Sequence, residues 1–361
     1  MFYYYYFIFL LFLVILSEYN FSKNVKFIFT SITIFSFIII GGGRYEVGAD
    51  WSSYKDIFNK IDEINLLLNG KEYLFLFLNL LFSKIGIGYN FFVFIIFLGA
   101  FISKYLSISR FTFNIPFALL IYFLTLFIFF DINGIRQGLS IGILFLSITP
   151  NYKRQFIKFS ILVFCASLLH YTAIVYLPFY FISTFKIYPK KLFFIVILIF
   201  LSSFFIEKFL INSVFGKLIT AYENLQRYNY YVNNTETPVV DKFGLAVLNR
   251  LIILFLIIRN SNNIKINESL KNLLVNSYLI SILLFLLLSF NQDFANRLSY
   301  YFKFVEIILI PLIVHFEKRI FKKYLYLFVF VLIYFLSFLR IMMIQDNELL
   351  PYNNSVLNFF N

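Results

Sequence analysis

The chain has 361 residues, of which 61% are hydrophobic and only 14% are charged, and its formal net charge at pH 7 is +13. Soluble globular domains are near half apolar and about a quarter charged. So apolar a chain cannot hide its hydrophobic side chains inside one water-facing domain, and its composition therefore excludes a soluble fold.

Lipid must then be the solvent, and lipid restricts the backbone to two architectures. Every N–H and C=O group in hydrocarbon needs a partner within the protein, which leaves helical bundles and closed β-barrels. Barrel strands alternate apolar and polar residues, whereas Leu192–Ile206 and Leu279–Phe290 are apolar on nearly every side. The sequence therefore predicts helices.

Apolar runs that are long enough, or nearly so, to cross about 30 Å of hydrocarbon recur along the whole chain. They lie at roughly 2–16, 25–41, 90–108, 114–131, 134–149, 155–171, 172–185, 191–211, 243–259, 270–290, 297–316 and 322–343. A shorter run, Tyr73–Phe82, is bounded by charges and is expected to be re-entrant or interfacial. We predict an all-α polytopic membrane protein with roughly 11–13 transmembrane or re-entrant helices, forming a single integral membrane domain over residues 1–361.

The basic residues gather between alternate apolar runs, which is the arrangement that the positive-inside rule gives to cytoplasmic loops. This distribution accounts for the net charge without nucleic acid as a partner. The segments assigned to the outside are Asp131–Arg136, the turn near His170, residues 212–242, Asn291–Arg297 and the tail after Arg340. The loops assigned to the cytoplasm hold Lys153, Arg154, Lys158, Lys186, Lys190, Lys191, Arg259, Lys265, Lys271, Lys318, Arg319, Lys322 and Lys323.

The first third of the chain allows two topologies. If residues 42–70 lie outside, Lys23 and Lys26 are cytoplasmic and the run at 73–82 does not cross the membrane. If that run crosses, residues 42–70 are cytoplasmic. We favour the outside because this loop holds more acidic than basic residues and carries the first of three polar motifs. The expected external loops are thus at about 42–70 and 212–242.

The first motif follows the second predicted helix. The glycines Gly41–Gly43 end that helix and would allow the backbone to approach a ligand closely. Arg44 and Asp50 then lie at the membrane edge, where a charge is costly unless it is paired or hydrated, and an amphipathic stretch begins at Tyr54. The pattern indicates a binding loop, and an interfacial loop with aromatic anchors is the alternative.

The second motif surrounds the start of the helix at 134–149. Asn133 is expected to cap this helix, which places Arg136 and Gln137 in its first turn. An arginine there opposes the helix dipole, so we expect an anion to compensate it. Helical N–H groups beside an arginine suit a phosphate. An ion pair with Asp131 is the alternative.

The third motif contains Asn296, Arg297, Tyr300 and Tyr301. The last three stand at i, i+3 and i+4 and should share one helical face. A second arginine at the external start of a helix suggests an anionic ligand common to both. An ion pair between Arg297 and Asp293 is the alternative.

His170 lies where a predicted helix reaches the outside, and it fits a catalytic and a structural role equally well. The other histidine, His315, lies on the opposite side, so the two cannot share a metal site. Nucleotide-binding loops, serine-nucleophile elbows and Asp-x-Asp metal motifs are absent from the sequence. We expect neither a metal ion nor another cofactor.

These motifs, in this order, resemble the EpsG-like branch of the Wzy-type bacterial polysaccharide polymerases, which make O-antigen, capsule or exopolysaccharide. The resemblance covers nearly the whole chain. Ala49 stands where Thr or another small polar residue is expected, and this leaves Asp50 unaffected. The matching pieces are Arg44 with Gly48-Ala-Asp50-Trp51 and Tyr54, Ile-Arg136-Gln137-Gly-Leu, Leu-His170-Tyr-Thr-Ala, Asn296-Arg297 with Tyr300-Tyr301 and Pro311, and Pro351-Tyr352.

The resemblance implies a multi-pass glycosyltransferase of GT-C-like architecture in the bacterial inner or plasma membrane. Such an enzyme transfers a growing glycan from undecaprenyl diphosphate to a sugar hydroxyl of the next lipid-linked repeat unit, on the outer side of the membrane. Its partners would be undecaprenyl-diphosphate-linked oligosaccharides, membrane lipid, a flippase and a chain-length regulator.

This chemistry implies a role for each motif. The diphosphate leaving group needs cations in a low-dielectric site, for which Arg136 and Arg297 are suitable. The acceptor hydroxyl needs a base, either Asp50, which we prefer, or His170. The other residues expected to bind substrate or diphosphate are Arg44, Tyr54, Gln137, Asn296, Tyr300 and Tyr301.

Two other classes of membrane protein share many of these features. A flippase or transporter for lipid-linked oligosaccharides would have the same helices and arginines, but it should show internal repeats and charges at mid-helix. The sequence shows neither. A glycan ligase would share nearly all the chemistry and differ only in its acceptor. A membrane O-acyltransferase would need a histidine deep in the membrane, whereas His170 is expected at the outer end of a helix.

Overall fold

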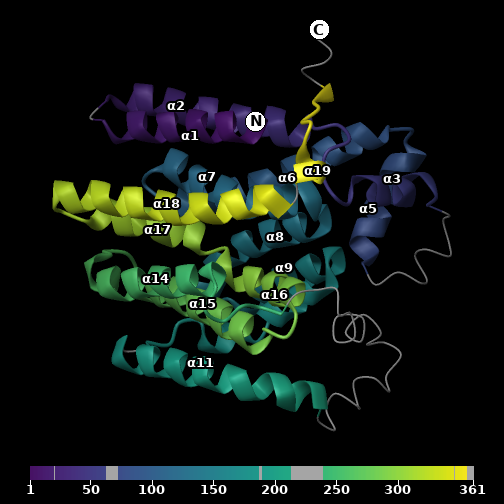
Figure 1. Cartoon of the computed structure of the whole chain (residues 1–361). Helices are drawn as coiled ribbons and strands as arrows, with labels where there is room; N and C mark the ends of the chain where they lie inside the picture. Colours follow the sequence, from purple (N-terminus) through teal and green to yellow (C-terminus); the bar gives the residue numbers. More distant parts are fainter. Residues whose placement is uncertain (20, 62–71, 187–188, 213–238, 345, 356–361) are drawn as a thin grey trace. The chain divides into compact units, whose positions relative to one another are not determined.

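The computed structural model of the chain describes all residues except 20, 62–71, 187–188, 213–238, 345 and 356–361. The described residues form helices joined by turns (Figure 1), with one isolated β-bridge between Arg44 and Asn354. The predicted all-α class is confirmed. The end of the expected external loop at 42–70, and nearly all of the one at 212–242, lie outside the described residues.

Contacts divide the described chain into two compact units. Unit 1 is Met1–Leu177 with Ile307–Asn361, and unit 2 is Pro178–Glu306. The helices of unit 1 are α1 (Phe2–Glu18), α2 (Lys23–Phe37), η1 (Ile38–Gly42), α3 (Trp51–Asn59), α5 (Tyr73–Lys84), α6 (Tyr89–Phe111), α7 (Ile115–Tyr122), η2 (Phe123–Asn133), α8 (Ile135–Tyr152), α9 (Phe156–Leu169), η3 (Tyr171–Tyr176), nearly all of α17 (Glu306–Phe316), α18 (Ile320–Ile344) and α19 (Asp346–Leu349). Those of unit 2 are α10 (Phe179–Ile182), α11 (Pro189–Asn212), α14 (Leu245–Asn260), η5 (Ser261–Asn263), α15 (Glu268–Leu287) and α16 (Gln292–Lys303).

Within the described residues, 6 helical stretches are long and apolar enough to cross a membrane, and α16 with α17 makes up to 7. The polytopic class is thereby confirmed. The spans and short apolar helices correspond to the runs read from the sequence, except the run at 134–149, which forms α8 and is in neither group. The six stretches are Lys23–Gly42, Tyr89–Phe111, Ile115–Asn133, Leu245–Asn263, Glu268–Leu287 and Ile320–Met343. The shorter apolar helices are Phe2–Glu18, Tyr73–Lys84, Phe156–Leu169, Tyr171–Ile182 and Phe194–Phe205.

Two apolar runs that were expected to form single helices are broken. The run at 172–185 becomes η3 and α10, with Pro178 between them. The helix breaks there because proline has no N–H to donate to the preceding turn. The run at 297–316 becomes α16 and α17. At this second break Lys303 Nζ lies 3.1 Å from Glu306 Oε1, so two buried charges neutralise each other.

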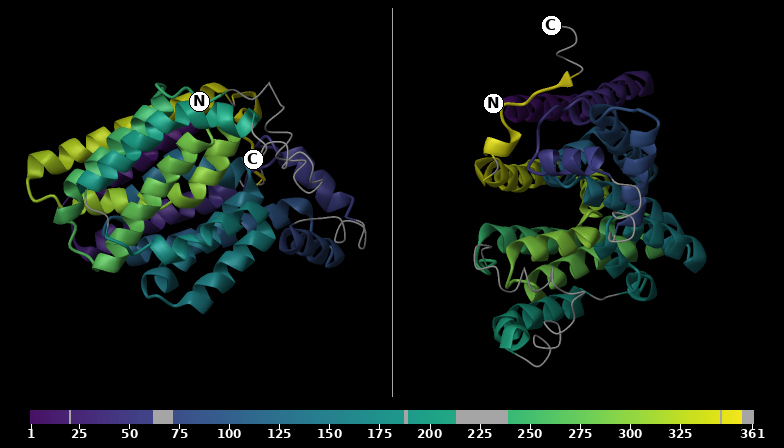
Figure 2. Two further views of the ribbon diagram at one scale, coloured as in Figure 1. Left: turned by 90° about the horizontal axis from the view of Figure 1, so that it is seen from below. Right: turned by 90° about the vertical axis from the view of Figure 1, so that its right-hand side faces the viewer.

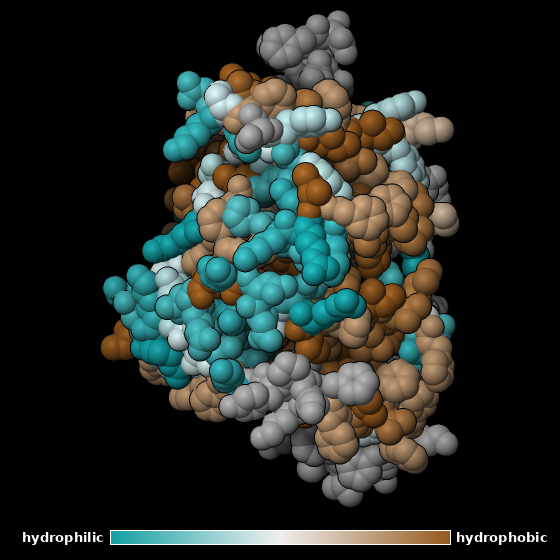
Figure 3. All heavy atoms as spheres, turned by 90° about the vertical axis from the view of Figure 1, so that its left-hand side faces the viewer, coloured by the Kyte–Doolittle hydropathy of each residue, from teal (hydrophilic) through white to brown (hydrophobic). Residues whose placement is uncertain are grey.

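The central span of unit 1 is formed by α7 and η2. In Ile115–Asn133, 89% of the apolar window is buried inside the protein, whereas in Lys23–Gly42 only 28% is buried. Many outer helices expose large apolar side chains, such as Phe164 and Phe328. Figure 3 shows hydrophobic residues covering much of one face beside a gathering of hydrophilic ones. This surface suits a lipid environment.

Two π-helical segments, η1 and η2, end near the predicted polar motifs of unit 1. π-Helical turns are rare and are frequent at functional sites. In η1 the glycines allow close packing: a Cβ on Gly41 would lie 2.2 Å from the Phe97 ring, and one on Gly42 would lie 2.6 Å from the Phe94 ring. These two glycines therefore serve helix packing, and the expectation that they let a ligand approach the backbone is wrong.

The run at 73–82 forms α5, whose 12 residues extend about 18 Å and cannot cross the hydrocarbon. Figures 1 and 2 show α3 and α5 together beyond one end of the long helices of unit 1. Both helices fit an interfacial position, which agrees with the topology that puts residues 42–70 outside.

Ser52, which is exposed on α3, offers a test of this topology. In a Cys165→Ala background the chain has no other cysteine, so Ser52→Cys should be labelled by an impermeant maleimide on intact spheroplasts. Lys153→Cys, at the far end of α8, is the control and should be labelled only after permeabilisation. If Ser52→Cys behaves like this control, residues 42–70 are cytoplasmic.

Candidate functional site

Arg136 is the second residue of α8 and lies in its first turn, as the sequence predicts. Its Nη1 forms an ion pair with Glu72 Oε2, and its Nε donates a hydrogen bond to the Tyr54 hydroxyl at 3.2 Å. The guanidinium carbon lies 5.1 Å from the centre of the Tyr54 ring and 5.8 Å from that of Phe75. Because 27% of the Arg136 side chain is exposed, a ligand can reach its remaining N–H donors.

The carboxylate that faces Arg136 belongs to Glu72, which no motif in the sequence marked. Glu72 is buried, and its second oxygen, Oε1, is bonded to His170 Nδ1. A buried carboxylate is stable only when it is paired, and here two donors share it. The signal in the sequence was its position, since Glu72 directly precedes the apolar run Tyr73–Phe82.

His170 lies where α9 ends, as predicted. Its backbone is extended, with φ −149° and ψ 109°, and leads directly into η3. The imidazole is buried but bonded to a carboxylate. Through Glu72 the fold therefore brings His170 and Arg136, which come from different motifs, into one polar group.

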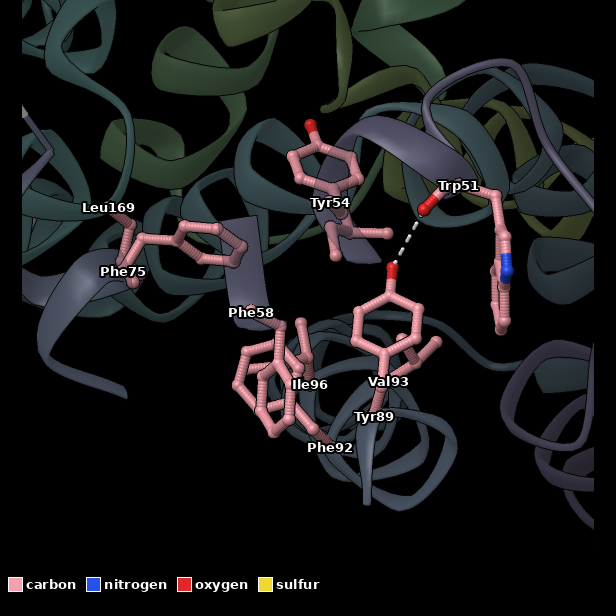
Figure 4. Packing of buried hydrophobic residues seen from close by; sticks show 10 residues of the cluster. Trp51, Tyr54, Phe58, Phe75, Tyr89, Phe92, Val93, Ile96 and Leu169 are labelled. Atoms are coloured by element: carbon pink, nitrogen blue, oxygen red, sulfur yellow. Dashed lines mark hydrogen bonds between the residues drawn. The ribbon is translucent and has the colours of Figure 1, made fainter. Parts of the chain in front are cut away.

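Tyr54 connects this polar group to an aromatic cluster beneath α3 (Figure 4). Burial raises the pKa of the Tyr54 hydroxyl, so the hydroxyl stays protonated at neutral pH and keeps one hydrogen to donate. The Tyr89 hydroxyl donates to the Trp51 carbonyl oxygen at 3.2 Å, which ties α6 to α3. The cluster contains Trp51, Tyr54, Phe58, Phe75, Tyr89, Phe92, Val93, Ile96, Ile135 and Leu169.

Asp131 pairs with Lys104, and the alternative in which it neutralises Arg136 is wrong. Lys104 Nζ lies 2.5 Å from Asp131 Oδ1 and 2.9 Å from the Gly138 carbonyl oxygen. The Tyr122 hydroxyl donates to Asp131 Oδ2 at 2.7 Å. Both charged side chains are buried. This network joins α6 to the end of η2 and the first turns of α8, so it holds the helix start that carries Arg136.

Asn133 does not cap α8, so the expected cap is wrong. Gly134 occupies the N-cap position, and Asn133 Oδ1 accepts a hydrogen bond from the Ala49 N–H at 3.1 Å. The amide thus fastens the first motif to the second. Gln137 lies in the first turn of α8 as expected, but its side chain is buried.

The loop from Gly43 to Asp50 is held on two sides. Toward η2, Gly48 has a φ of 114°, and a Cβ there would lie 2.7 Å from the Ile132 carbonyl oxygen, so glycine is required. Toward the C-terminal tail, the Gly48 N–H donates to the Glu348 carbonyl oxygen at 3.0 Å. The tail after α18 is therefore part of the structure that shapes this loop.

Arg44 is 1% exposed and lies inside this loop. Its Nη1 donates to the Gly41 carbonyl oxygen at 2.9 Å, and its guanidinium carbon lies 5.8 Å from the centre of the Trp51 ring. Its backbone forms the bridge to Asn354. These contacts show that Arg44 stabilises the loop. A substrate outside the protein cannot reach so buried a side chain.

Asp50 occupies the N-cap position of α3 and is only partly buried. Its carboxylate makes no capping hydrogen bond, and among the described residues it forms no ion pair with Arg44 or another cation. The two charges of the first motif, Arg44 and Asp50, therefore do not pair with each other. The Asp50 carboxylate retains free lone pairs beside Tyr54 and Trp51.

In unit 2 the four residues of the third motif lie in α16. Arg297 is exposed, Asn296 is partly buried, and Tyr300 and Tyr301 are buried. Lys303 Nζ lies 4.7 Å from the centre of the Tyr300 ring. Arg297, Tyr300 and Tyr301 lie in one α-helix at the spacing that gives a shared face, as predicted. Of the four residues, solvent reaches Arg297 and part of Asn296.

A second basic residue of unit 2 was missed in the sequence. Arg250 of α14 is 6% exposed within a candidate span. Its Nη2 donates to Asn296 Oδ1 at 3.3 Å, and its guanidinium carbon lies 3.6 Å from the centre of the Phe285 ring. An ionisable residue in such a place marks a functional region by default, and the signal was a basic residue inside the apolar run at 243–259.

Comparison with known proteins gives one match. The sequence model of one family, described as the EpsG family, matches residues 26–354. No curated protein and no solved structure matches the chain. All the polar residues described above lie within the matched range.

Removing one member of the Lys104–Asp131 pair should destabilise the protein more than removing both. Lys104→Met leaves a buried carboxylate without its cation, at a cost of about 3–5 kcal/mol. The double variant Lys104→Met/Asp131→Leu leaves no charge and should recover most of the loss. Thermal unfolding of the detergent-solubilised protein, followed by circular dichroism, measures the difference.

The matched control is Lys60→Met, because Lys60 forms a solvent-exposed pair with Asp56 and such pairs contribute about 0–1 kcal/mol. Its unfolding temperature should stay close to that of the wild type. Equal stability of Lys104→Met and the wild type would contradict the pairing.

Proposed function

The chain belongs to the EpsG family, a Wzy-like polysaccharide polymerase family, and on this premise we propose that it joins undecaprenyl-diphosphate-linked oligosaccharide repeat units on the outer side of the bacterial cytoplasmic membrane. Family membership supports a polysaccharide polymerase-type role in general. The observation that supports the finer proposal is the group of Glu72, Arg136 and His170 at one end of unit 1, in which Glu72 and His170 are buried and Arg136 is partly exposed.

The leaving group of this reaction is a diphosphate, whose negative charge grows as the glycosidic bond breaks. Arg136 is a cation at the start of a helix in an apolar surrounding, where electrostatic stabilisation of such a charge is strong. Glu72 and Tyr54 occupy only two of its N–H donors. The others are free to bind phosphate oxygens in the bidentate manner of a guanidinium.

Glu72 acts as a positioning residue in this proposal. Its two oxygens are taken by Arg136 and His170, so it has no oxygen directed at a substrate. It holds both side chains in fixed orientations and keeps the imidazole close to the arginine. His170 is then suited to hold a hydroxyl or a diphosphate oxygen by a hydrogen bond.

Asp50 is the proposed general base, because its carboxylate is partly exposed and forms no ion pair among the described residues. In the reaction the acceptor hydroxyl gives its proton to Asp50 and its oxygen forms the bond to the anomeric carbon of the donor sugar. At the same time the bond from that carbon to the diphosphate oxygen breaks. Undecaprenyl diphosphate leaves with the bonding electron pair, and Arg136 stabilises the charge.

Unit 2 has an exposed arginine of its own, Arg297. Arg297 is exposed near the start of α16, and Asn296 beside it is held by Arg250. We assign Arg297 and Asn296 to phosphate oxygens of a lipid-linked substrate. The buried residues Tyr300 and Tyr301 in unit 2, and Arg44 and Gln137 in unit 1, would each shape the binding region of their own unit without touching the ligand.

The proposed partners follow from the substrate. Donor and acceptor are both undecaprenyl-diphosphate-linked oligosaccharides, so the enzyme works within membrane lipid. A flippase would deliver these repeat units to the outer side, and a chain-length regulator would set the length of the product.

Deletion of the gene, followed by a gel of surface polysaccharide, tests the function. A polymerase is supported if single-repeat glycan replaces the ladder of long chains. Complete loss of surface glycan would instead indicate a flippase, because no repeat unit would then reach the outer side.

Arg136→Ala should lower the polymerisation rate about 100-fold or more, the loss expected when one donor to a transition-state oxyanion is removed. Arg136→Lys should also lower it, because an ammonium group cannot bind phosphate oxygens in the bidentate manner. Arg297→Ala should abolish polymerisation, so that no ladder of long chains forms. The rates are measured with purified lipid-linked repeat units, after membrane insertion has been checked by immunoblot.

Arg110→Ala is the matched control, since Arg110 is an exposed arginine at the C-terminal end of α6. Its activity should remain near that of the wild type. Full activity of Arg136→Lys would refute the bidentate role of Arg136.

Asp50→Asn should lower turnover about 100-fold or more, because general base catalysis contributes roughly that much. Asp56→Asn, a carboxylate change on the exposed part of α3, should leave turnover unchanged. Near-normal turnover of Asp50→Asn together with a strong loss in His170→Gln would move the role of base to His170.

We further propose that arginines neutralise the diphosphate, so that polymerisation needs no divalent metal. Polymerisation in vitro should then proceed at the same rate with and without EDTA. Activity that disappears with EDTA and returns with magnesium would contradict this part of the proposal.

A further inference from the structure

A cavity of about 380 Å³ lies beside the first turn of α3. Its walls come from two parts of unit 1 that are distant in the sequence, the first polar loop and the C-terminal tail, which the hydrogen bond from Gly48 to Glu348 holds together. Asp50 follows one lining residue in the chain and precedes another. The lining residues are Glu46, Gly48, Ala49, Trp51, Ser52, Lys55 and Glu348.

The loop that forms one wall is held in an unusual backbone conformation. Glu46 has a φ of 54°, in the left-handed region that residues with a side chain rarely adopt. Strain of this kind persists only where the surrounding structure imposes it, and it is frequent at ligand-binding sites. The contacts of Gly48 with η2 and with the tail supply that constraint.

Trp51 provides an independent observation beside this cavity. Its indole Nε1 is buried and has no hydrogen-bond partner among the described residues. An unpaired buried N–H costs about 1–3 kcal/mol, so an acceptor atom is expected there. Figure 4 shows the indole at the edge of the labelled side chains, with Tyr89 on one side of it.

The lining groups have the chemistry of a carbohydrate site. The carboxylates of Glu46 and Glu348 accept hydrogen bonds from sugar hydroxyls, and Ser52 and Lys55 can donate to ring and hydroxyl oxygens. Two carboxylates against one ammonium give the lining a net charge of −1. This charge favours a neutral sugar or an amino sugar over a uronic acid or a phosphate.

We propose that this cavity is the subsite for a neutral or amino sugar ring of the acceptor repeat unit. The proposal rests on the polymerase function proposed above. A sugar bound there has a hydroxyl beside Asp50, the proposed base. The diphosphate end of the donor lies with Arg136, so acceptor sugar and leaving group occupy different parts of the site.

The single tryptophan of the chain makes the cavity directly observable. Because the sequence contains one Trp and it lines the cavity, fluorescence excited where tyrosine does not absorb reports on this site alone. The probe is the repeat-unit oligosaccharide released from its lipid, added to the purified full-length protein in nanodiscs. Galacturonic acid, inorganic phosphate and empty phosphatidylglycerol vesicles are the comparison ligands.

Wild-type protein should give a saturable fluorescence change with the oligosaccharide. Glu348→Gln and Glu46→Gln should each weaken the apparent affinity roughly tenfold, the loss expected for one hydrogen bond to a charged group. Both variants should raise the KM for the acceptor with little change in kcat. Asp56→Asn, which lies outside the cavity on the same helix, is the matched control and should bind like the wild type.

The outcomes separate the subsite from the function. If a preparation that polymerises repeat units gives no saturable change, or responds only to phosphate, uronic acid or lipid vesicles, the subsite is refuted while the polymerase function stands. If the oligosaccharide binds in the expected way to a protein that polymerises nothing, the subsite stands and the proposed function fails. A glutamine variant that lowers kcat and leaves the fluorescence titration unchanged would also refute the subsite.

Discussion

The site of unit 1 depends on one buried carboxylate, that of Glu72. Such a group at the end of an apolar helix bundle is stable only if cations and hydrogen-bond donors come to it, since an unpaired buried charge costs several kcal/mol. Arg136 from the start of α8 and His170 from the end of α9 meet this need. The start of α5 must therefore lie against the ends of two other helices, and this places Tyr54 and the aromatic cluster of α3 beside Arg136.

A second buried pair, Lys104 with Asp131, joins α6 to the end of η2 and the first turns of α8. Both side chains are almost completely enclosed, so they neutralise each other and act on the site only through η2 and α8. Arg136 differs because part of its guanidinium remains exposed after pairing. The same rule, that charges in an apolar surrounding must be paired, thus yields a structural pair in one place and an accessible cation in another.

The helices and the positions of several site residues follow from local properties of the sequence. Apolar runs show where helices lie, and an arginine directly after a helix start, such as Arg136, is visible without a structure. Glu72, Lys104 and Arg250 were not found in this way because each stands inside or beside an apolar run with no local partner. Their partners lie in other helices, and the proposed capping role of Asn133 failed because its acceptor oxygen bonds to Ala49 of a distant loop.

The sequence by itself determined the helical membrane class, the alternation of basic and polar loops and the grouping of motifs at helix ends, because these depend on composition and on neighbouring residues. Tertiary structure alone decided which charges meet. In the folded protein Asp131 pairs with Lys104, and Glu72 contacts both Arg136 and His170. Arg44 is buried, and the Asp50 carboxylate has no cation beside it among the described residues. The physical reason is that each of these ion pairs joins residues from helices that are distant in the sequence. The hydrophobic pattern of one helix does not show which other helix it will contact.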